Sequence, residues 1–166
     1  MRHTFVEENK IFKIETDKAD AFITLNPIYH KTILSDVDLI IIDGNTAILM
    51  EYKNSNIPNA AKPEIFDSMV KTDDHYMKIA RKYYDSMLYI SNINMKFNNK
   101  KYYYVLEAKN MDSVLRKIIA GKIKKKLPFN IHKELGLAQT LVDEFHVVSI
   151  EDWNKTFKDY SFTAVT

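Results

Sequence analysis

The chain contains no cysteine and only three glycines among its 166 residues. The lack of cysteine excludes disulfide scaffolds, zinc–thiolate sites and thiol nucleophiles, and it is compatible with a reducing interior. With so few glycines, a glycine-rich phosphate-binding loop is also excluded. Aliphatic runs such as 39–42 are far shorter than the ~20 residues that cross a bilayer, and charges near the start argue against a signal peptide. We therefore expect a cytoplasmic protein that does not span a membrane.

Neither sign of charge dominates, because 24 basic and 22 acidic residues leave a formal net charge of +2. Such a balance does not by itself indicate a nucleic-acid-binding protein, so a basic surface must come from local clustering. The hydrophobic fraction of 46%, with ten tyrosines and nine phenylalanines, is typical of globular proteins. No repeat or shift in composition marks a boundary, and we expect a single domain over 1–166.

The segment 38–54 carries the most information and has the pattern of a β-hairpin. Two strands rich in isoleucine and leucine flank the turn residues Asp43, Gly44 and Asn45. Glycine and asparagine accept the positive φ angles that tight hairpin turns require. Both faces of the hairpin are largely apolar, which indicates a central position in a sheet that is covered on both sides.

The remaining chain alternates between helical and strand patterns. Helices are predicted over 64–84, over 113–120 with a stop at Gly121, over 128–142 and over 151–157, and a helix start is compatible with 4–14. Strands are predicted over 21–28, 87–90, 102–106 and 145–149. This order predicts an α/β fold with a central mixed sheet flanked by helices.

Three side chains at the ends of the hairpin strands are expected to lie together. Asp38 opens the first strand, and Glu51 and Lys53 close the second, where residues two apart point to the same face. Mg²⁺ and Mn²⁺ prefer oxygen ligands, which the two carboxylates supply, and the main-chain carbonyl of Tyr52 is a further candidate ligand. Lys53 would stand beside an attacking water. This set contains the groups that metal-assisted phosphodiester hydrolysis requires.

Asp38, twelve intervening residues and then Glu51-Tyr52-Lys53 resemble the motif of the PD-(D/E)XK nuclease superfamily. The resemblance implies a restriction-endonuclease-like three-layer fold, with a helix before the hairpin, a helix after it and a further paired strand. It implies that Asp38 and Glu51 bind Mg²⁺ or Mn²⁺ and that Lys53 is the catalytic lysine. The motif covers about a tenth of the chain, and Val37 stands where the family's name has proline.

Other acidic residues compete for places in this site. Asp36 has the same strand parity as Asp38 but lies outside the apolar run. Many members of the family carry a further metal-binding glutamate on their first helix. The resemblance makes Glu7, Glu8 and Glu15 candidates for that position, and Glu8 is preferred.

Two other features have ordinary structural interpretations. Glu107-Ala108-Lys109 repeats the E-x-K spacing, but no aspartate on a paired apolar strand accompanies it, so we interpret it as the exit of a strand. The helix after the hairpin carries His75, which can approach the site but is interpreted as a surface residue. His3 is a weaker candidate of the same kind.

The densest basic stretch is a candidate nucleic-acid-binding surface. Clustered lysine and arginine bind phosphates through counterion release, although the solvated end of a helix gives the same pattern. Its members are Arg116, Lys117, Lys122, Lys124, Lys125 and Lys126.

Together these features predict a nuclease that depends on Mg²⁺ or Mn²⁺ and acts on DNA in preference to RNA. The alternative is a catalytically silent nuclease-like fold that binds nucleic acid or a protein. Dimers are common in the family because two strands need two active sites, so a homodimer is compatible with this interpretation.

Overall fold

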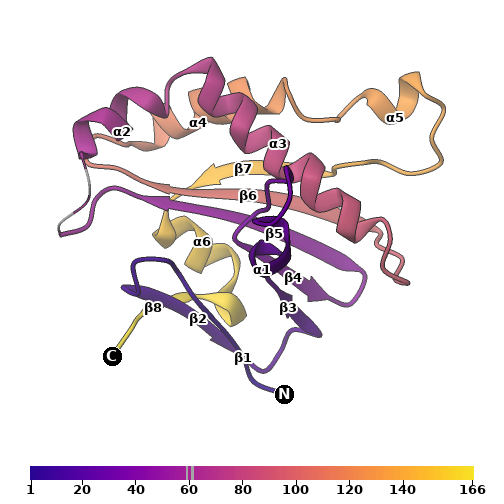
Figure 1. Ribbon diagram of the computed structural model, residues 1–166, viewed down its shortest axis with the longest axis horizontal. Helices are drawn as coiled ribbons and strands as arrows, with labels where there is room; N and C mark the ends of the chain where they lie inside the picture. Colours follow the sequence, from indigo (N-terminus) through magenta and orange to yellow (C-terminus); the bar gives the residue numbers. More distant parts are fainter. Residues whose placement is uncertain (59, 61) are drawn as a thin grey trace.

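The computed structural model describes residues 1–58, 60 and 62–166, and it is an α/β structure built on two sheets (Figure 1). The larger sheet is mixed and has the order β3 (Ala21–Ile23), β4 (Leu39–Asp43), β5 (Thr46–Asn54), β6 (Asn99–Glu107) and β7 (Glu144–Val148). The smaller sheet is antiparallel and has the order β1 (His3–Val6), β2 (Phe12–Thr16) and β8 (Phe162–Ala164). The predicted α/β class and mixed sheet are confirmed.

The helices connect and cover these strands. They are α1 (Asn26–Tyr29), α2 (Pro63–Met69), α3 (Asp73–Ile90), α4 (Ser113–Lys124), α5 (Ile131–Glu134) and α6 (Ile150–Thr156), with a short 3₁₀ helix at Lys158–Tyr160. No helix in the described part of the chain is both long and apolar enough to cross a membrane.

The predicted hairpin forms the centre of the larger sheet. β4 and β5 pair antiparallel from Leu39↔Met50 to Asp43↔Thr46, and Gly44 in the turn has φ 52°. The long connection through α2 and α3 then brings β6 alongside β5 in the parallel direction, as crossover connections of this length allow. β5 therefore has a paired strand on each edge.

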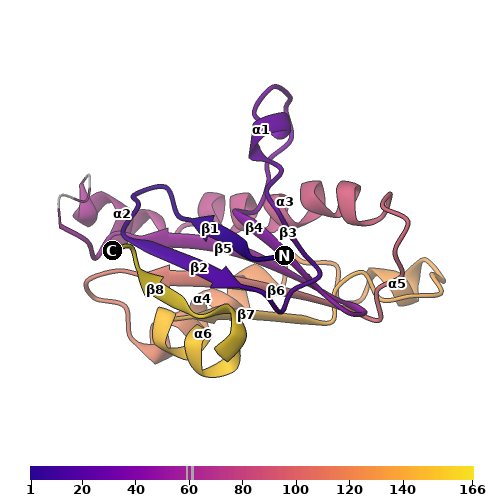
Figure 2. The same ribbon diagram turned by 90° about the horizontal axis from the view of Figure 1, so that it is seen from below.

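Each face of the larger sheet buries its own core. Alternate residues of β4 divide between them: Ile40 packs under the helices with Tyr83, and Ile41 packs on the other side with Trp153. Figures 1 and 2 show α3 and α4 on one face and α6 with the smaller sheet on the other. The predicted cover on both faces is present, although a second sheet supplies much of it on one side.

The N-terminal segment differs from the expected helix. Residues 4–14 lie in β1, a turn and β2, and Phe5 pairs with Ile14. These two side chains are buried and their immediate neighbours are more exposed, which suits strands with one buried face. Before the hairpin, the one helix in the described part of the chain is the four-residue α1, so the helix that the resemblance implies at this place is present only as a single turn.

Several predicted boundaries also move. The stretch 87–90 is the end of α3 rather than a strand, because Ile90 continues the buried helical stripe that includes Tyr83. The expected helix over 64–84 divides at Val70, and Thr72 caps the second part by accepting from the amide of His75. α4 continues through Gly121, and only 131–134 of the predicted helix 128–142 is helical.

Candidate functional site

The end of β5 places the motif residues on one face of the sheet. Glu51 and Lys53 face α3, and Glu51 is fully buried, with 0% of its side chain exposed. Tyr52 points to the opposite face, where its ring stacks on Phe162 at a centroid distance of 5.2 Å. The two-residue period of a strand thus brings the acid and the amine together, as the sequence predicts.

Asp38 lies at a bend immediately before β4 and reaches the same end of β5. Its Oδ2 accepts a 2.7 Å hydrogen bond from the backbone amide of Tyr52. In a strand, the N–H and C=O of one residue point to the same edge. The Tyr52 carbonyl therefore also faces the Asp38 side, beyond the last β4–β5 pair at Leu39↔Met50.

Two lysines approach the Glu51 carboxylate. Lys82 Nζ, from α3, donates to Glu51 Oε2 at 2.8 Å, whereas Lys53 Nζ lies 3.7 Å from Oε1. Oε1 is buried and has no hydrogen-bond partner in the described residues. A buried carboxylate oxygen is normally satisfied, so this atom is open to a proton, a water or a cation.

Burial and charge set the protonation of these groups. Burial, and secondly the nearby Asp38 carboxylate, raise the pKa of Glu51 to about 7 despite the two lysines. Burial acts to lower the pKa of Lys53, but the charges of Glu51 and Asp38 outweigh it and raise that pKa. Lys53 is therefore an ammonium at neutral pH, and a divalent cation would favour the ionised form of Glu51.

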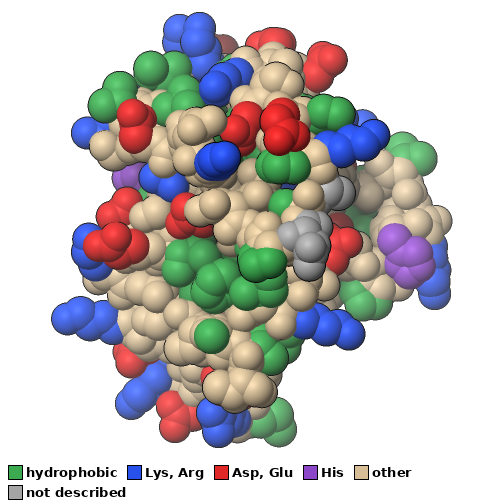
Figure 3. All heavy atoms as spheres, turned by 90° about the vertical axis from the view of Figure 1, so that its left-hand side faces the viewer, with side chains coloured by type: hydrophobic (Ala, Val, Ile, Leu, Met, Phe, Trp, Pro, Cys, Tyr) green, Lys and Arg blue, Asp and Glu red, His purple; other side chains and the backbone are tan. Residues whose placement is uncertain are grey.

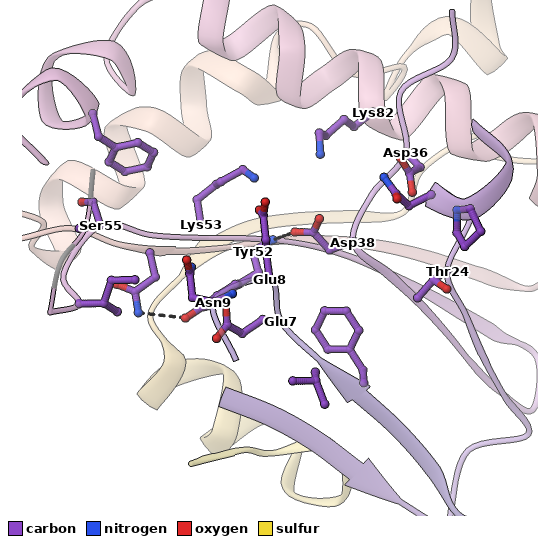
Figure 4. A pocket seen from close by; sticks show the side chains of 18 residues that line it. Glu7, Glu8, Asn9, Thr24, Asp36, Asp38, Tyr52, Lys53, Ser55 and Lys82 are labelled. Carbon is purple, nitrogen blue, oxygen red and sulfur yellow. Dashed lines mark hydrogen bonds between the residues drawn. The ribbon is translucent and has the colours of Figure 1, made fainter. Parts of the chain in front are cut away.

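Asp38, Lys53 and Lys82 border a pocket of about 760 Å³ (Figure 4), and Glu51 lies buried behind them, outside its lining. Lys53 and Lys82 extend toward one another across it, with Asp38 beneath them and Asp36 beside Lys82. The turn between β1 and β2 forms one wall, and Glu8 lies there. The pocket thus combines several carboxylates with two amines, which is the chemistry of a site for a cation and a phosphate.

Another wall comes from residues 24–38, called here the α1 arm, which stands out from the body in Figure 2. Two hydrogen bonds fix the arm to Asp85 of α3. Tyr29 Oη donates to the Asp85 carbonyl at 2.9 Å, and the Ser35 amide donates to Oδ2 at 2.8 Å. The arm is therefore a fixed border of the pocket.

The three candidate N-terminal glutamates have different environments. The carboxylate of Glu7 accepts the amides of Asn9, Ile11 and Phe12 and so closes the β1–β2 turn. Glu15 forms ion pairs with two basic side chains, Arg2 and Lys13. Glu8 borders the pocket, and its charge helps Glu51 and Asp38 to raise the pKa of Lys53 against the opposing effect of burial.

His75 is buried, with 5% exposure, so its interpretation as a surface residue is wrong. Its Nε2 is 2.9 Å from the hydroxyl of Tyr104, the residue that pairs with Glu51 in β6. Burial, helped by the charge of Lys53, lowers the pKa of His75 to about 4, so the ring is neutral at pH 7. His3 stacks on Phe22.

Lys82 is the residue of this site that the sequence reasoning missed. It lies seven residues after His75 and therefore on nearly the same face of α3, a face that is buried. A lysine on the buried face of a helix needs an anionic partner, and Glu51 is that partner. The seven-residue spacing between His75 and Lys82 is the feature of the sequence that could have identified Lys82.

Not every residue of the predicted basic surface lies at the surface of the protein. Arg116 is 8% exposed, and its guanidinium donates to the Leu106 carbonyl and to Glu107, each at 3.0 Å. Its assignment to a surface that contacts nucleic acid is therefore corrected to a structural role. Glu107 also accepts the amide of Ile150, which agrees with interpreting the second E-x-K as a strand exit.

The lysines of this stretch lie away from the pocket. α4 packs on β7 and against α3, whereas the pocket lies at the β4–β5 end, on the other side of α3. Lys126 pairs with Asp73 at 2.7 Å, and Lys124 lies over the ring of Phe129. Lys117, Lys122 and Lys125 are exposed.

Figure 3 shows the face at which β5, β6 and β7 end. Basic and acidic side chains are interspersed over it, and hydrophobic side chains gather near its centre. A second pocket of about 570 Å³ is bordered by Ile11, Phe12, Pro58 and Ile150, among others. It contains no lysine, which distinguishes it from the pocket at Lys53.

Within 1–58, 60 and 62–166, no group of three or more histidine, aspartate or glutamate side chains is placed to hold a metal ion. The predicted donor set, which consists of the Asp38 and Glu51 carboxylates with the Tyr52 carbonyl, has two carboxylates and stays a prediction. Together with the unpartnered Oε1 of Glu51, this oxygen set fits a hard divalent cation that keeps several waters. No family model, curated protein or solved structure matches the chain.

Proposed function

We propose that the chain is a metal-dependent nuclease with a restriction-endonuclease-like fold, which hydrolyses phosphodiester bonds in DNA. One observation carries the proposal. The fully buried Glu51 lies beside Lys53, in the field of Asp38, and its Oε1 lacks a hydrogen-bond partner among the described residues. Burying an incompletely paired acid costs folding free energy, so its presence beside a pocket supports a functional role.

The order of elements supports the same proposal. An apolar hairpin is followed by the long helix α3, and β6 then pairs parallel to the strand that carries Glu51. These features agree with the core that the resemblance implies. The short α1 departs from it, and the β1–β2 turn contributes Glu8 in place of a first helix.

Each group has a chemical role under this proposal. Asp38, Glu51 and the Tyr52 carbonyl would hold Mg²⁺ or Mn²⁺, which supplies charge to polarise a phosphate and to acidify a water. Lys53 is protonated and 39% exposed, so it can orient the attacking water or neutralise charge that develops on the phosphate. Asp38 is held in place by the amide of Tyr52.

The test is cleavage by purified protein with Mn²⁺ or Mg²⁺ and with EDTA. Substrates are plasmid, single-stranded DNA and RNA, since the proposal favours DNA. We expect cleavage with metal, none with EDTA, and a loss of at least about 100-fold in Lys53→Met. Lys101→Met is the matched control, because Lys101 pairs with Glu144, at the start of β7 and far from the pocket.

Metal-independent cleavage, or full activity in Lys53→Met, would contradict the proposal. Size-exclusion chromatography with light scattering, run with and without duplex DNA, tests whether two copies assemble on two strands. Dimerisation is part of the proposal only for a duplex substrate, since one site is enough to cleave a single strand.

One observation favours a second function, a silent nuclease-like module that binds nucleic acid or a protein. Lys82 already neutralises Glu51 at 2.8 Å, as an ion pair would in a fold that has lost its metal. This alternative predicts no cleavage with any metal. If the module binds nucleic acid, it also predicts binding that weakens steeply with salt.

A further inference from the structure

We propose that Lys82 is a resident counter-ion of Glu51 that a divalent cation displaces, so that this lysine sets the metal affinity of the site. The inference rests on the proposed function, because it assumes that Glu51 is a metal ligand. It concerns a residue outside the D…E-x-K motif and assigns a competitive role to it.

The first step is the contact itself. Lys82 Nζ lies 2.8 Å from Glu51 Oε2, so a cation that binds that oxygen competes with the ammonium for it. The carboxylate is fully buried, so water cannot replace the lysine as it would at a surface. Without a metal, Lys82 is therefore the principal partner of Glu51.

The second step is that Lys82 is able to leave. Its side chain is 21% exposed and reaches the pocket from α3 on a flexible four-carbon stem. Asp36 borders the same pocket beside it (Figure 4), and the charge of Lys82 acts to lower the pKa of Asp36, although burial raises that pKa. Asp36 is thus an alternative partner within the pocket.

The third step is electrostatic. A divalent cation between Asp38 and Glu51 would repel an ammonium that shares the same carboxylate, and the repulsion is strong at such short range. The cation brings twice the charge of Lys82 and can also use the unpartnered Oε1. Metal binding therefore favours release of Lys82, and the lost ion pair weakens the apparent affinity.

The experiment measures Mn²⁺ affinity by electron paramagnetic resonance or calorimetry, with no substrate present. Lys82→Met removes the competitor but keeps an apolar stem, and we expect Mn²⁺ to bind about tenfold more tightly. Lys82→Arg keeps the charge and adds a bidentate partner for the carboxylate, so we expect weaker binding.

Lys78→Met is the matched control. Lys78 is exposed on α3, one turn before Lys82, and is not paired with Glu51. The variant therefore removes one charge from the same helix and leaves the Lys82–Glu51 contact in place. We expect it to change the Mn²⁺ affinity less than twofold. A shift in Lys78→Met as large as in Lys82→Met would overturn direct competition in favour of a general field effect.

The remaining outcomes are decisive. Unchanged or weaker Mn²⁺ binding in Lys82→Met overturns the inference. If that variant does not fold, unchanged or tighter Mn²⁺ binding in Lys82→Arg overturns it instead. If the wild-type protein binds Mn²⁺ and cleaves DNA but Lys82→Met does not bind Mn²⁺ more tightly, the inference is rejected and the proposed function is not. Tighter binding in Lys82→Met with no cleavage by any variant would support competition and reject the nuclease. No Mn²⁺ binding by any variant would overturn both.

Discussion

The backbone amide of Tyr52 donates a 2.7 Å hydrogen bond to Oδ2 of Asp38, which ties the start of β4 to the end of β5. The bond replaces a sheet hydrogen bond at the point where the β4–β5 ladder has ended. A side chain that completes a ladder in this way is held in one orientation. The remaining carboxylate oxygen of Asp38 is then available to a cation.

Metal should stabilise the folded protein. At a Mn²⁺ concentration of 100 times Kd, binding adds about 2.7 kcal/mol, which raises Tm by about 5–10 °C in a chain of this size. Asp38→Asn keeps an oxygen for the Tyr52 amide but removes the charge, so it should lose most of this shift. Differential scanning calorimetry with Mn²⁺ and with EDTA provides the measurement. An equal shift in wild type and Asp38→Asn would exclude Asp38 as a ligand.

Glu51→Gln should stabilise the metal-free protein at pH 8. Burial and the Asp38 charge raise the pKa of Glu51 to about 7, so ionised Glu51 disfavours folding above that pH. The folded state binds the extra proton between pH 4.5 and about 7, and wild-type stability from this group falls as pH rises through that range. We expect a gain of about 1–3 kcal/mol at pH 8 and almost none at pH 4.5.

Urea unfolding in EDTA at both pH values measures this difference. A Glu51→Gln protein that is less stable than wild type at pH 8 would show that the Lys82 ion pair outweighs the cost of burying the charge. The same variant should bind Mn²⁺ more weakly, which gives an independent check that the position is functional.

His75 should make the protein sensitive to acid. Burial, and then the lysine charges, lower its pKa to about 4 from an ordinary value of 6.5, so the unfolded chain takes up a proton first. Stability from this group is therefore complete above pH 6.5 and is lost as pH falls toward 4, by about 3 kcal/mol. His75→Gln keeps a partner for the Tyr104 hydroxyl and does not titrate.

The difference in unfolding free energy between wild type and His75→Gln, followed from pH 7 to pH 4, isolates this contribution. Other titrating groups, including Glu51, contribute to both proteins and cancel. A difference that does not change with pH would mean that the folded protein accommodates the imidazolium.

The basic residues of α4 should separate into two classes. Reversing the exposed charges in Lys122→Glu with Lys125→Glu should weaken nucleic-acid binding and reduce its dependence on salt, if α4 contacts phosphates. Arg116→Met should instead lower stability by about 1–3 kcal/mol, because it removes the guanidinium that donates to the Leu106 carbonyl and pairs with the partly exposed Glu107. Fluorescence anisotropy at several salt concentrations and urea unfolding measure the two effects.

An Arg116→Met protein with normal stability would contradict the structural role given to that residue. Unchanged binding in the double lysine variant would remove α4 from the nucleic-acid surface, and attention would move to the pocket border at Glu8 and the α1 arm.

The hairpin and the grouping of the side chains at its end could be predicted because the signals are local. Glu51 and Lys53 share a face through the period of a strand, and Gly44 fixes the turn that brings Asp38 within reach. Strand pairing then needs only apolar runs of matching length. The sequence alone therefore indicated which residues would meet.

The remaining features depend on contacts between distant segments. Residues 4–14 form strands because β2 pairs with β8, which lies some 150 residues later and has a weak pattern of its own. The short apolar run 87–90 is compatible with a buried strand or with a buried helix, and the packing of α3 selects the helix. Lys82 joins the site only because α3 crosses over β5.

Strand β5 is paired on both edges and covered on both faces, and the side chains from Ala47 to Tyr52 are buried. Amides in such a position exchange with deuterium only through the largest opening reactions of a protein. Glu51 and Lys53 directly follow the stretch of β5 that is paired on both edges and remain paired to β6, while Glu8 lies on a peripheral turn. We therefore expect the β1–β2 turn and side chains such as Lys82 to move when a ligand binds, and the β5 backbone at Glu51 and Lys53 to keep its position.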